Sequence, residues 1–156
     1  MMKITQWLKQ DLIIEELNGE TSEQVLKEMV NFLKNKNLIS KEKELYQKLI
    51  ERERLGSTGI GGGIAIPHCK FKWVKNPIVL LALSHKGVKF NSLDGKPVYV
   101  FFLVISSPDN PSLHLQILAS VAHLARKGGN LIKTFLSAKN SQQIYEIIKN
   151  EEEQLS

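Results

Sequence analysis

The sequence predicts an α/β fold in which one central sheet is flanked by helices on both faces. Two segments with apolar residues at helical spacing come first, two continuous apolar runs of strand length follow, and further helical segments close the chain. The 156 residues are 42% hydrophobic and 24% charged, which is ordinary for a globular protein with a sizeable core. Because no repeat, linker or shift in composition marks a boundary, we expect a single domain over residues 1–156.

Two helices are predicted before the sheet. The segment Thr21–Gln24 reads TSEQ, the pattern of a helix-capping box, and apolar residues recur after it at helical spacing. We therefore expect a helix over residues 22–35. A second helix is predicted over residues 41–54, with Leu45 and Leu49 in its apolar stripe.

Arg52 falls on the apolar stripe of the second predicted helix. It lies seven residues after Leu45 and three after Leu49, so its side chain shares their direction. A buried guanidinium needs an anion beside it. That anion can be a carboxylate in an internal ion pair, or a phosphate held by the fork of the guanidinium.

Strands are predicted in the middle of the chain. The apolar runs at residues 78–83 and 98–105 are rich in branched and aromatic side chains, which is typical of strands covered on both faces. Asp94-Gly95 between them is a hairpin turn signal. A shorter apolar run, residues 64–66, stops at Pro67, because proline cannot donate to a sheet ladder.

The last part of the chain is predicted to be helical. Asn110 and Pro111 form a helix start, and that helix is expected to continue to about residue 127 and to stop at Gly128-Gly129. A short helix over residues 130–136 and a terminal helix over residues 141–150 with a charged tail complete the prediction.

Residues 56–63 read GSTGIGGG, a run that a helix would not tolerate well. Glycines beside a hydroxyl suggest an anion-accepting loop, with Thr58, Gly59 and Gly61 as its candidate residues. The alternative is a tight connection between a helix and a strand. No lysine follows the glycines as a P-loop requires, and the dinucleotide pattern started at Gly59 fails at Ile64.

Two histidines are candidates for chemistry. His68 follows Pro67 at the end of a short apolar run, so a stiff scaffold presents it, and neutral imidazole is a competent nucleophile. His114 lies in the first turn of the helix that begins at Pro111, where free backbone N–H groups favour an anion. His123, nine residues after His114, is expected to face the opposite side of the helix and to be exposed to solvent. His85 is interpreted as a polar residue at a strand end.

Several classes of function are excluded by the composition. No C-x-x-C, H-E-x-x-H or G-x-S-x-G element occurs, so we expect no metal, no cofactor and no serine nucleophile. The net charge is +5, but the lysines are scattered, so no nucleic-acid partner is predicted. Without a long apolar run or an export signal we expect no membrane insertion, and with Cys69 as the one cysteine we expect a cytoplasmic location.

The segment from Arg52 to His68, RERLGSTGIGGGIAIPH, resembles the active-site segment of a known family. The family comprises the enzyme IIA domains of the fructose/mannitol class in the bacterial phosphoenolpyruvate-dependent phosphotransferase system. The chain is most similar to the stand-alone nitrogen-regulatory enzyme IIA proteins. The resemblance covers nearly the whole sequence, including FNSLDGKPVYVFFLVISSP and the predicted helix with His114.

The resemblance implies a mixed sheet and a phosphoryl carrier that works through a phosphohistidine intermediate. His68 would accept the phosphoryl group through Nε2 from the histidine-containing phosphocarrier protein. His114 and Arg52 match the family residues that stabilise the phosphate, and Thr58 lies in the same motif. Two departures are Cys69, where the family usually has glycine, and Gly62, which often corresponds to asparagine.

The resemblance leaves three functions open. Phosphorylation can control a regulatory target protein, as in the nitrogen-type proteins. It can instead supply a sugar-transport enzyme IIB. The third possibility is a non-catalytic interaction module that retains the site residues.

Overall fold

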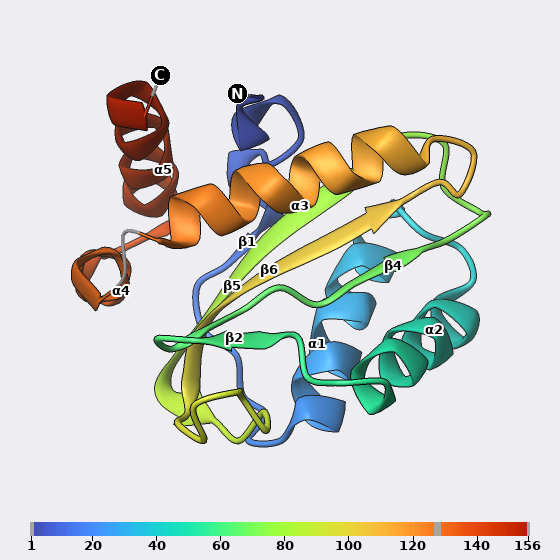
Figure 1. The fold of residues 1–156 in the computed structure, drawn as a ribbon, viewed down its shortest axis with the longest axis horizontal. Helices are drawn as coiled ribbons and strands as arrows, with labels where there is room; N and C mark the ends of the chain where they lie inside the picture. The colour runs from blue at the N-terminus through green and yellow to red at the C-terminus, as the bar shows by residue number, and fades with distance from the viewer. Residues whose placement is uncertain (1, 127–128, 156) are drawn as a thin grey trace.

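The computed structural model describes residues 2–126 and 129–155. The helices and strands follow one another along the chain in the order shown in Figure 1. They are the 3-10 helices η1 (Ile4–Gln6) and η2 (Gln10–Leu12), then β1 (Ile13–Ile14), α1 (Ser22–Asn35), α2 (Glu42–Arg54), β2 (Gly59–Gly61), β3 (Ile64–Ala65), β4 (His68–Lys70), β5 (Ile78–Val88), β6 (Val98–Ser106), α3 (Pro111–Ala125), α4 (Gly129–Ser137) and α5 (Ser141–Leu155).

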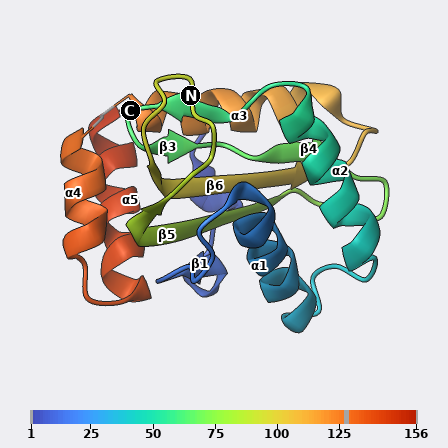
Figure 2. The same ribbon diagram turned by 90° about the horizontal axis from the view of Figure 1, so that it is seen from below.

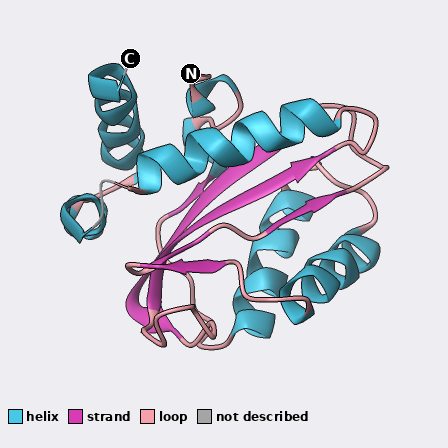
Figure 3. Ribbon diagram, in the orientation of Figure 1, coloured by secondary structure: helices cyan, strands magenta, loops and turns pink. Residues whose placement is uncertain are grey.

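The strands form one mixed sheet. Figure 3 shows its strands in magenta. Their order is β1-β5-β6-β3-β2, and β4 pairs with β6 as well. β1 runs parallel to β5, and both β3 and β4 run parallel to β6. The hairpin β5–β6 and the pair β2–β3 are antiparallel. The prediction of a mixed sheet is therefore confirmed.

Helices cover both faces of this sheet, as predicted. α1 and α2 pack together on one face, α3 lies along the other, and α5 contacts α3 and β1 (Figures 1 and 2). The centre of the sheet is the most deeply buried part, with Phe101, Phe102 and Leu103 fully inaccessible in β6. Buried side chains from every layer form a single hydrophobic cluster.

Strands β3 and β4 are two parts of one line of pairing along β6. Ala65 pairs with Phe101 and His68 with Val104, so the register is the same on both sides of the break. Pro67 causes the break because it has no N–H group, but its carbonyl still accepts the N–H of Val104 at 2.9 Å. His68 is thereby fixed as the first residue of a sheet strand.

The structure differs from the sequence predictions mainly at the ends of elements. β5 continues five residues past the predicted end at Leu83, because the ladder with β6 resumes after a register shift, where Val88 pairs with Val98. α5 continues to Leu155 instead of ending near residue 150 with a free tail. α3 ends at Ala125; of the predicted Gly128-Gly129 stop, Gly128 lies outside the described residues and Gly129 begins α4.

Candidate functional site

His68 presents one unprotonated ring nitrogen at the start of β4. Its Nδ1 lies 2.7 Å from the carbonyl oxygen of Ile66. A carbonyl can only accept, so Nδ1 carries the proton, and in the neutral ring Nε2 keeps its lone pair. The ring is half-buried, and this backbone contact fixes its orientation.

Arg52 reaches this unprotonated nitrogen from the last turn of α2. Its Nε donates to Nε2 of His68 at 3.3 Å, and a terminal guanidinium nitrogen donates to the carbonyl of Gly56 at 2.8 Å. Among the described residues, no carboxylate forms an ion pair with Arg52. Of the two alternatives left open by the sequence, the internal ion pair is therefore absent from this part of the chain, and the guanidinium faces the imidazole.

His114 lies against the other side of the site, in the first turn of α3. Its ring centroid is 5.7 Å from that of His68, and the two planes are inclined by 55°. The side chain is 4% exposed, and its Nδ1 contacts the hydroxyl of Ser106, which is also buried. Asn110 caps the helix by accepting the N–H of Leu113, as predicted for this helix start.

Both histidines are held in the neutral state. Burial lowers the pKa of His68 below its ordinary value, and the charge of Arg52 lowers it further, against the opposing effect of the Ile66 carbonyl. Burial lowers the pKa of His114 to about 4, with smaller contributions from His68 and Lys70. At neutral pH the site therefore contains two uncharged imidazoles and one guanidinium.

A shallow depression of about 400 Å³ surrounds these three side chains. Leu55 and Leu115 line it with 85% and 66% of their surface exposed. Lys48 and Lys70 add positive charge to its wall. Exposed leucines around a cationic hollow are typical of a surface that contacts another protein.

Cys69 also lines the depression, where the resemblance would place glycine. Its side chain is buried, and burial raises the pKa of the thiol to about 12. The thiol is therefore uncharged at neutral pH and is a poor nucleophile.

The glycine-rich loop is not brought to the two histidines. Thr58 donates both its backbone N–H and its hydroxyl to the carboxylate of Glu53. The N–H of Gly59 donates to the hydroxyl of Ser57 at 3.0 Å, and Gly61 lies at the β2–β3 hairpin with φ +94°. None of the three predicted loop residues lines the depression around His68.

The loop also joins two parts of the fold. Gly62 donates its N–H to the carboxylate of Asp94 at 3.0 Å, which joins the β2–β3 hairpin to the turn between β5 and β6. Gly62 has φ +66°, a conformation in which asparagine is among the better-tolerated non-glycine residues. The asparagine that often stands here in the family would fit the same backbone.

The other two histidines lie elsewhere. His85, in β5, contacts the carboxylate of Glu16 through Nδ1 and the carbonyl of Leu136 through Nε2 at 2.8 Å. His123 is partly buried on α3, where the sequence predicted exposure, and α3 also contacts η1 and α5. Neither residue lines the depression around His68.

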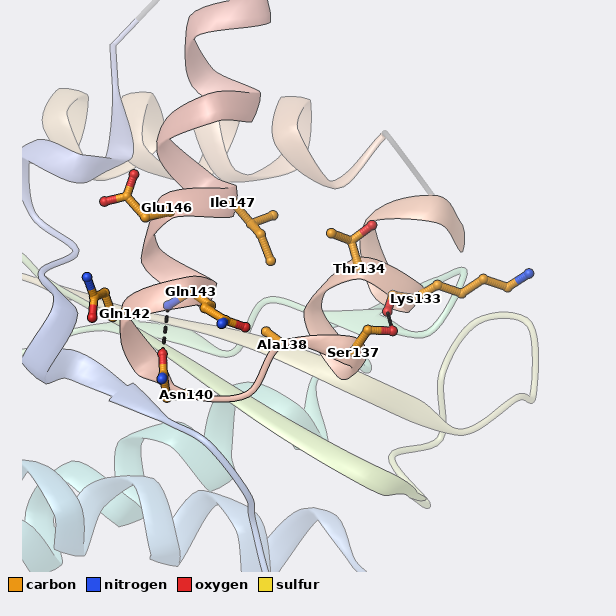
Figure 4. Close-up of a pocket in the computed structure, with 9 residues that line it drawn as sticks. All are labelled: Lys133, Thr134, Ser137, Ala138, Asn140, Gln142, Gln143, Glu146 and Ile147. Carbon is orange, nitrogen blue, oxygen red and sulfur yellow. Dashed lines mark hydrogen bonds between the residues drawn. The ribbon is translucent and has the colours of Figure 1, made fainter.

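A larger depression, of about 700 Å³, lies between α4 and α5 (Figure 4). Polar side chains such as Gln142, Gln143 and Glu146 line it, and Asn140 accepts the N–H of Gln143 at 2.9 Å. It is wide and open and contains no histidine or cysteine among its lining residues. We therefore assign the chemistry to the smaller depression around His68.

Two features are absent from residues 2–126 and 129–155. No group of three or more His, Cys, Asp or Glu side chains there could hold a metal ion. Likewise, no helix in this part of the chain combines the length and the apolar character needed to cross a bilayer.

The arrangement can support nucleophilic attack by Nε2 of His68 on an electrophile that carries negative charge. Arg52 supplies a cation at the attacking atom, and His114 supplies a second polar group. Sequence reasoning identified these three residues but missed Ser106. The available signal was weak, because Ser106 only follows the apolar run at residues 98–105, and the hydrogen-bond partner of its hydroxyl depends on how β6 is paired.

Comparisons with known proteins show the family of the chain. Residues 6–151 match the family model described as phosphoenolpyruvate-dependent sugar phosphotransferase system, EIIA 2. A fructose-specific EIIABC component of Bacillus subtilis is 33% identical over 94% of this chain, which spans 23% of that protein's length. A nitrogen regulatory protein of Pseudomonas aeruginosa is 28% identical over 95% of this chain and 96% of its own.

Solved structures show the same fold. The nitrogen regulatory protein IIA-Ntr of Neisseria meningitidis superposes with a TM-score of 0.83 at 24% identity, over 93% of this chain and 98% of its own. The mannitol enzyme IIA in a complex with phosphorylated enzyme IIB from Escherichia coli has a TM-score of 0.76 at 18% identity, over 92% and 97% of the two chains. With the family model covering residues 6–151, the chain belongs to the EIIA type 2 family of the phosphoenolpyruvate-dependent sugar phosphotransferase system.

Proposed function

We propose that this protein is a phosphoryl carrier that accepts a phosphoryl group on Nε2 of His68 and passes it to a partner protein. The observation that supports this most directly is the state of the ring. The Ile66 carbonyl holds the proton on Nδ1, so Nε2 is unprotonated, and its lone pair faces the cationic hollow and accepts a hydrogen bond from Arg52. Family membership supports the same chemistry.

The proposed step is an in-line displacement between two histidines. The N–P bond of the donor's phosphohistidine breaks as the bond from Nε2 of His68 to phosphorus forms, and the electron pair returns to the donor's ring. Positive charge develops on the His68 ring, and the Ile66 carbonyl stabilises it through the Nδ1 proton. Arg52 neutralises the transferred oxygens, and His114 donates a hydrogen bond to them.

The proposed donor is the histidine-containing phosphocarrier protein. A protein donor fits the site because the hollow is shallow and the exposed Leu55 and Leu115 give apolar area for docking. Positive charge from Lys48 and Lys70 favours a partner that carries a phosphate. We expect this exchange to take place in the cytoplasm.

The test is phosphorylation in a reconstituted system. The protein is incubated with phosphoenolpyruvate, the first enzyme of the system and the phosphocarrier, and its mass is then measured. We expect one acid-labile phosphate on the wild type and on His85→Ala, and none on His68→Ala. An acid-labile phosphate that persists on His68→Ala would refute the assignment.

For the acceptor we propose a regulatory target whose binding depends on the phosphorylation state. The match to nitrogen regulatory proteins over nearly their whole length favours this choice. The alternative is transfer to an enzyme IIB during sugar transport. The fructose-specific relative and the solved IIA–IIB complex favour that alternative.

These two roles make different predictions. Phosphorylated protein is mixed with purified fructose- and mannitol-type enzyme IIB domains, and loss of its phosphate is followed over time. Rapid loss to an enzyme IIB would favour transport. Regulation predicts slow loss, together with capture of a target by only one of the two phosphorylation states in a pull-down.

A further inference from the structure

Ser106, the last residue of β6, is buried and contacts Nδ1 of His114 through its hydroxyl. We propose that Ser106 is a positioning residue that keeps the proton of His114 on Nε2, so that His114 donates a hydrogen bond to the phosphoryl group on His68. This inference rests on the proposed function and adds a residue to it.

The sheet register places Ser106 where this role requires it. His68 pairs with Val104 and Lys70 pairs with Ser106 across the parallel β4–β6 ladder. Paired residues project to the same face of a sheet, and so do residues two apart in a strand. The side chains of His68 and Ser106 therefore lie on one face, and His114 contacts both of them.

Accounting for protons selects one of the two tautomers of His114. If Nδ1 carried the proton, it would donate to Ser106, and the hydroxyl hydrogen would need another acceptor. The hydroxyl has no other hydrogen-bond partner among the described residues, and Ser106 is 2% exposed. If the hydroxyl donates to Nδ1, both groups have a hydrogen-bond partner. This tautomer is therefore favoured, because a buried donor without a partner costs about 1–3 kcal/mol.

The tautomer decides what His114 offers to the site. With its pKa lowered to about 4, the ring is neutral at physiological pH and carries one N–H group. Its Nε2 makes no hydrogen bond to a described residue. In the tautomer selected above Nε2 is a donor, which suits a phosphoryl oxygen, whereas the other tautomer would present a lone pair to a negative charge.

The chain offers a matched control for a test of this role. Ser120 is also a buried serine, lies on the same helix as His114, and has a hydroxyl without a partner among the described residues. We compare Ser106→Ala, Ser106→Thr and Ser120→Ala by ¹⁵N NMR of the imidazole nitrogens, with His114→Gln to assign the signals. The rate of phosphoryl transfer to His68 is measured alongside.

We expect an Nε2–H tautomer of His114 in the wild type, in Ser106→Thr and in Ser120→Ala. In Ser106→Ala the two tautomers should become mixed, with a fall in transfer rate of about tenfold. An Nδ1–H tautomer in the wild type, or an unchanged tautomer in Ser106→Ala, would overturn the proposal even if the variant is less stable. A wild-type protein that takes no phosphate would instead remove the proposed function, and the NMR result would still describe the tautomer.

Discussion

His68 and His85 lie on the two strands that flank β6, and each uses both ring nitrogens. In His68, Nδ1 donates to the Ile66 carbonyl, and Nε2 faces the guanidinium of Arg52. In His85, Nδ1 contacts the Glu16 carboxylate, and Nε2 lies 2.8 Å from the Leu136 carbonyl. One ring therefore lies between an acceptor and a cation, and the other lies between two acceptors.

This difference shifts the pKa values of the two rings in opposite directions. The hydrogen bond to Glu16 raises the pKa of His85 above its ordinary value, because a ring that faces two acceptors is stabilised by a second proton. Burial and Arg52 lower the pKa of His68. The ring of His85 joins β5, the segment after β1 and the end of α4, whereas the neutral ring of His68 faces the depression.

The largest expected effect comes from giving His68 the surroundings of His85. Arg52→Glu places a carboxylate where the guanidinium donates to Nε2. It should raise the pKa of His68 and lower the rate of phosphoryl transfer at pH 7 by about 10³-fold or more, since both the nucleophile and the charge stabilisation are affected. NMR titration of His68 and rapid-quench transfer assays measure the two effects.

Arg52→Gln is the matched control, because it removes the charge without adding the opposite one. Its transfer rate should fall by about 10²-fold, with a smaller change in the pKa of His68. Equal rates for the two variants would show that the sign of the neighbouring charge is not what keeps His68 reactive.

An intermediate effect is expected on the pH dependence of stability. The pKa of His114 is lowered to about 4, so the native state binds fewer protons than the unfolded chain below about pH 6.5. The contribution of His114 to the free energy of unfolding is present above that pH and is lost as the pH falls. The loss between pH 7.5 and pH 5.5 should be about 1 kcal/mol. Urea unfolding of the wild type and His114→Gln at both values measures this, and parallel losses would contradict it.

The smallest effect should follow from Glu16→Gln, which removes the carboxylate from His85. The raised pKa of His85 means that its contribution is present below the unfolded pKa and is lost as the pH rises through the folded value. The variant should return the pKa towards its ordinary value. Because the pair is exposed, stability at pH 6 should fall by no more than about 0.5 kcal/mol.

Phosphorylation of His68 should be unchanged in Glu16→Gln. NMR titration of His85, unfolding curves at pH 6 and pH 9, and the mass assay test this prediction together. A loss of phosphorylation would show that the two histidine regions are coupled, which the structure gives no reason to expect.

The parts of this fold that depend on local pattern could be predicted from the sequence. The capping box before α1 and the Asn110-Pro111 start of α3 gave the starts of both helices, because these signals act within one turn. The direction of Arg52 followed from its place on the apolar stripe of α2. The Asn110-Pro111 start also placed His114 in the first turn of α3.

What could not be predicted depends on contacts between distant segments. Thr58 was a candidate phosphate residue, but Glu53 takes its hydroxyl, and the sequence does not show which acceptor a loop hydroxyl will meet. The place of Ser106 beside the site could be recognised only from the register of β4 on β6. The extension of β5 past Leu83 was missed because it depends on a register shift after which Val88 pairs with Val98.

The carbonyl that orients the reactive ring belongs to Ile66, only two positions before His68 and across Pro67. The tautomer of the nucleophile is thus encoded in a tripeptide and needs no side chain from a remote segment. Selection can therefore alter the surrounding surface to suit new recipients while the reacting atom stays correctly prepared. A unit of this kind is easily combined with different partner modules.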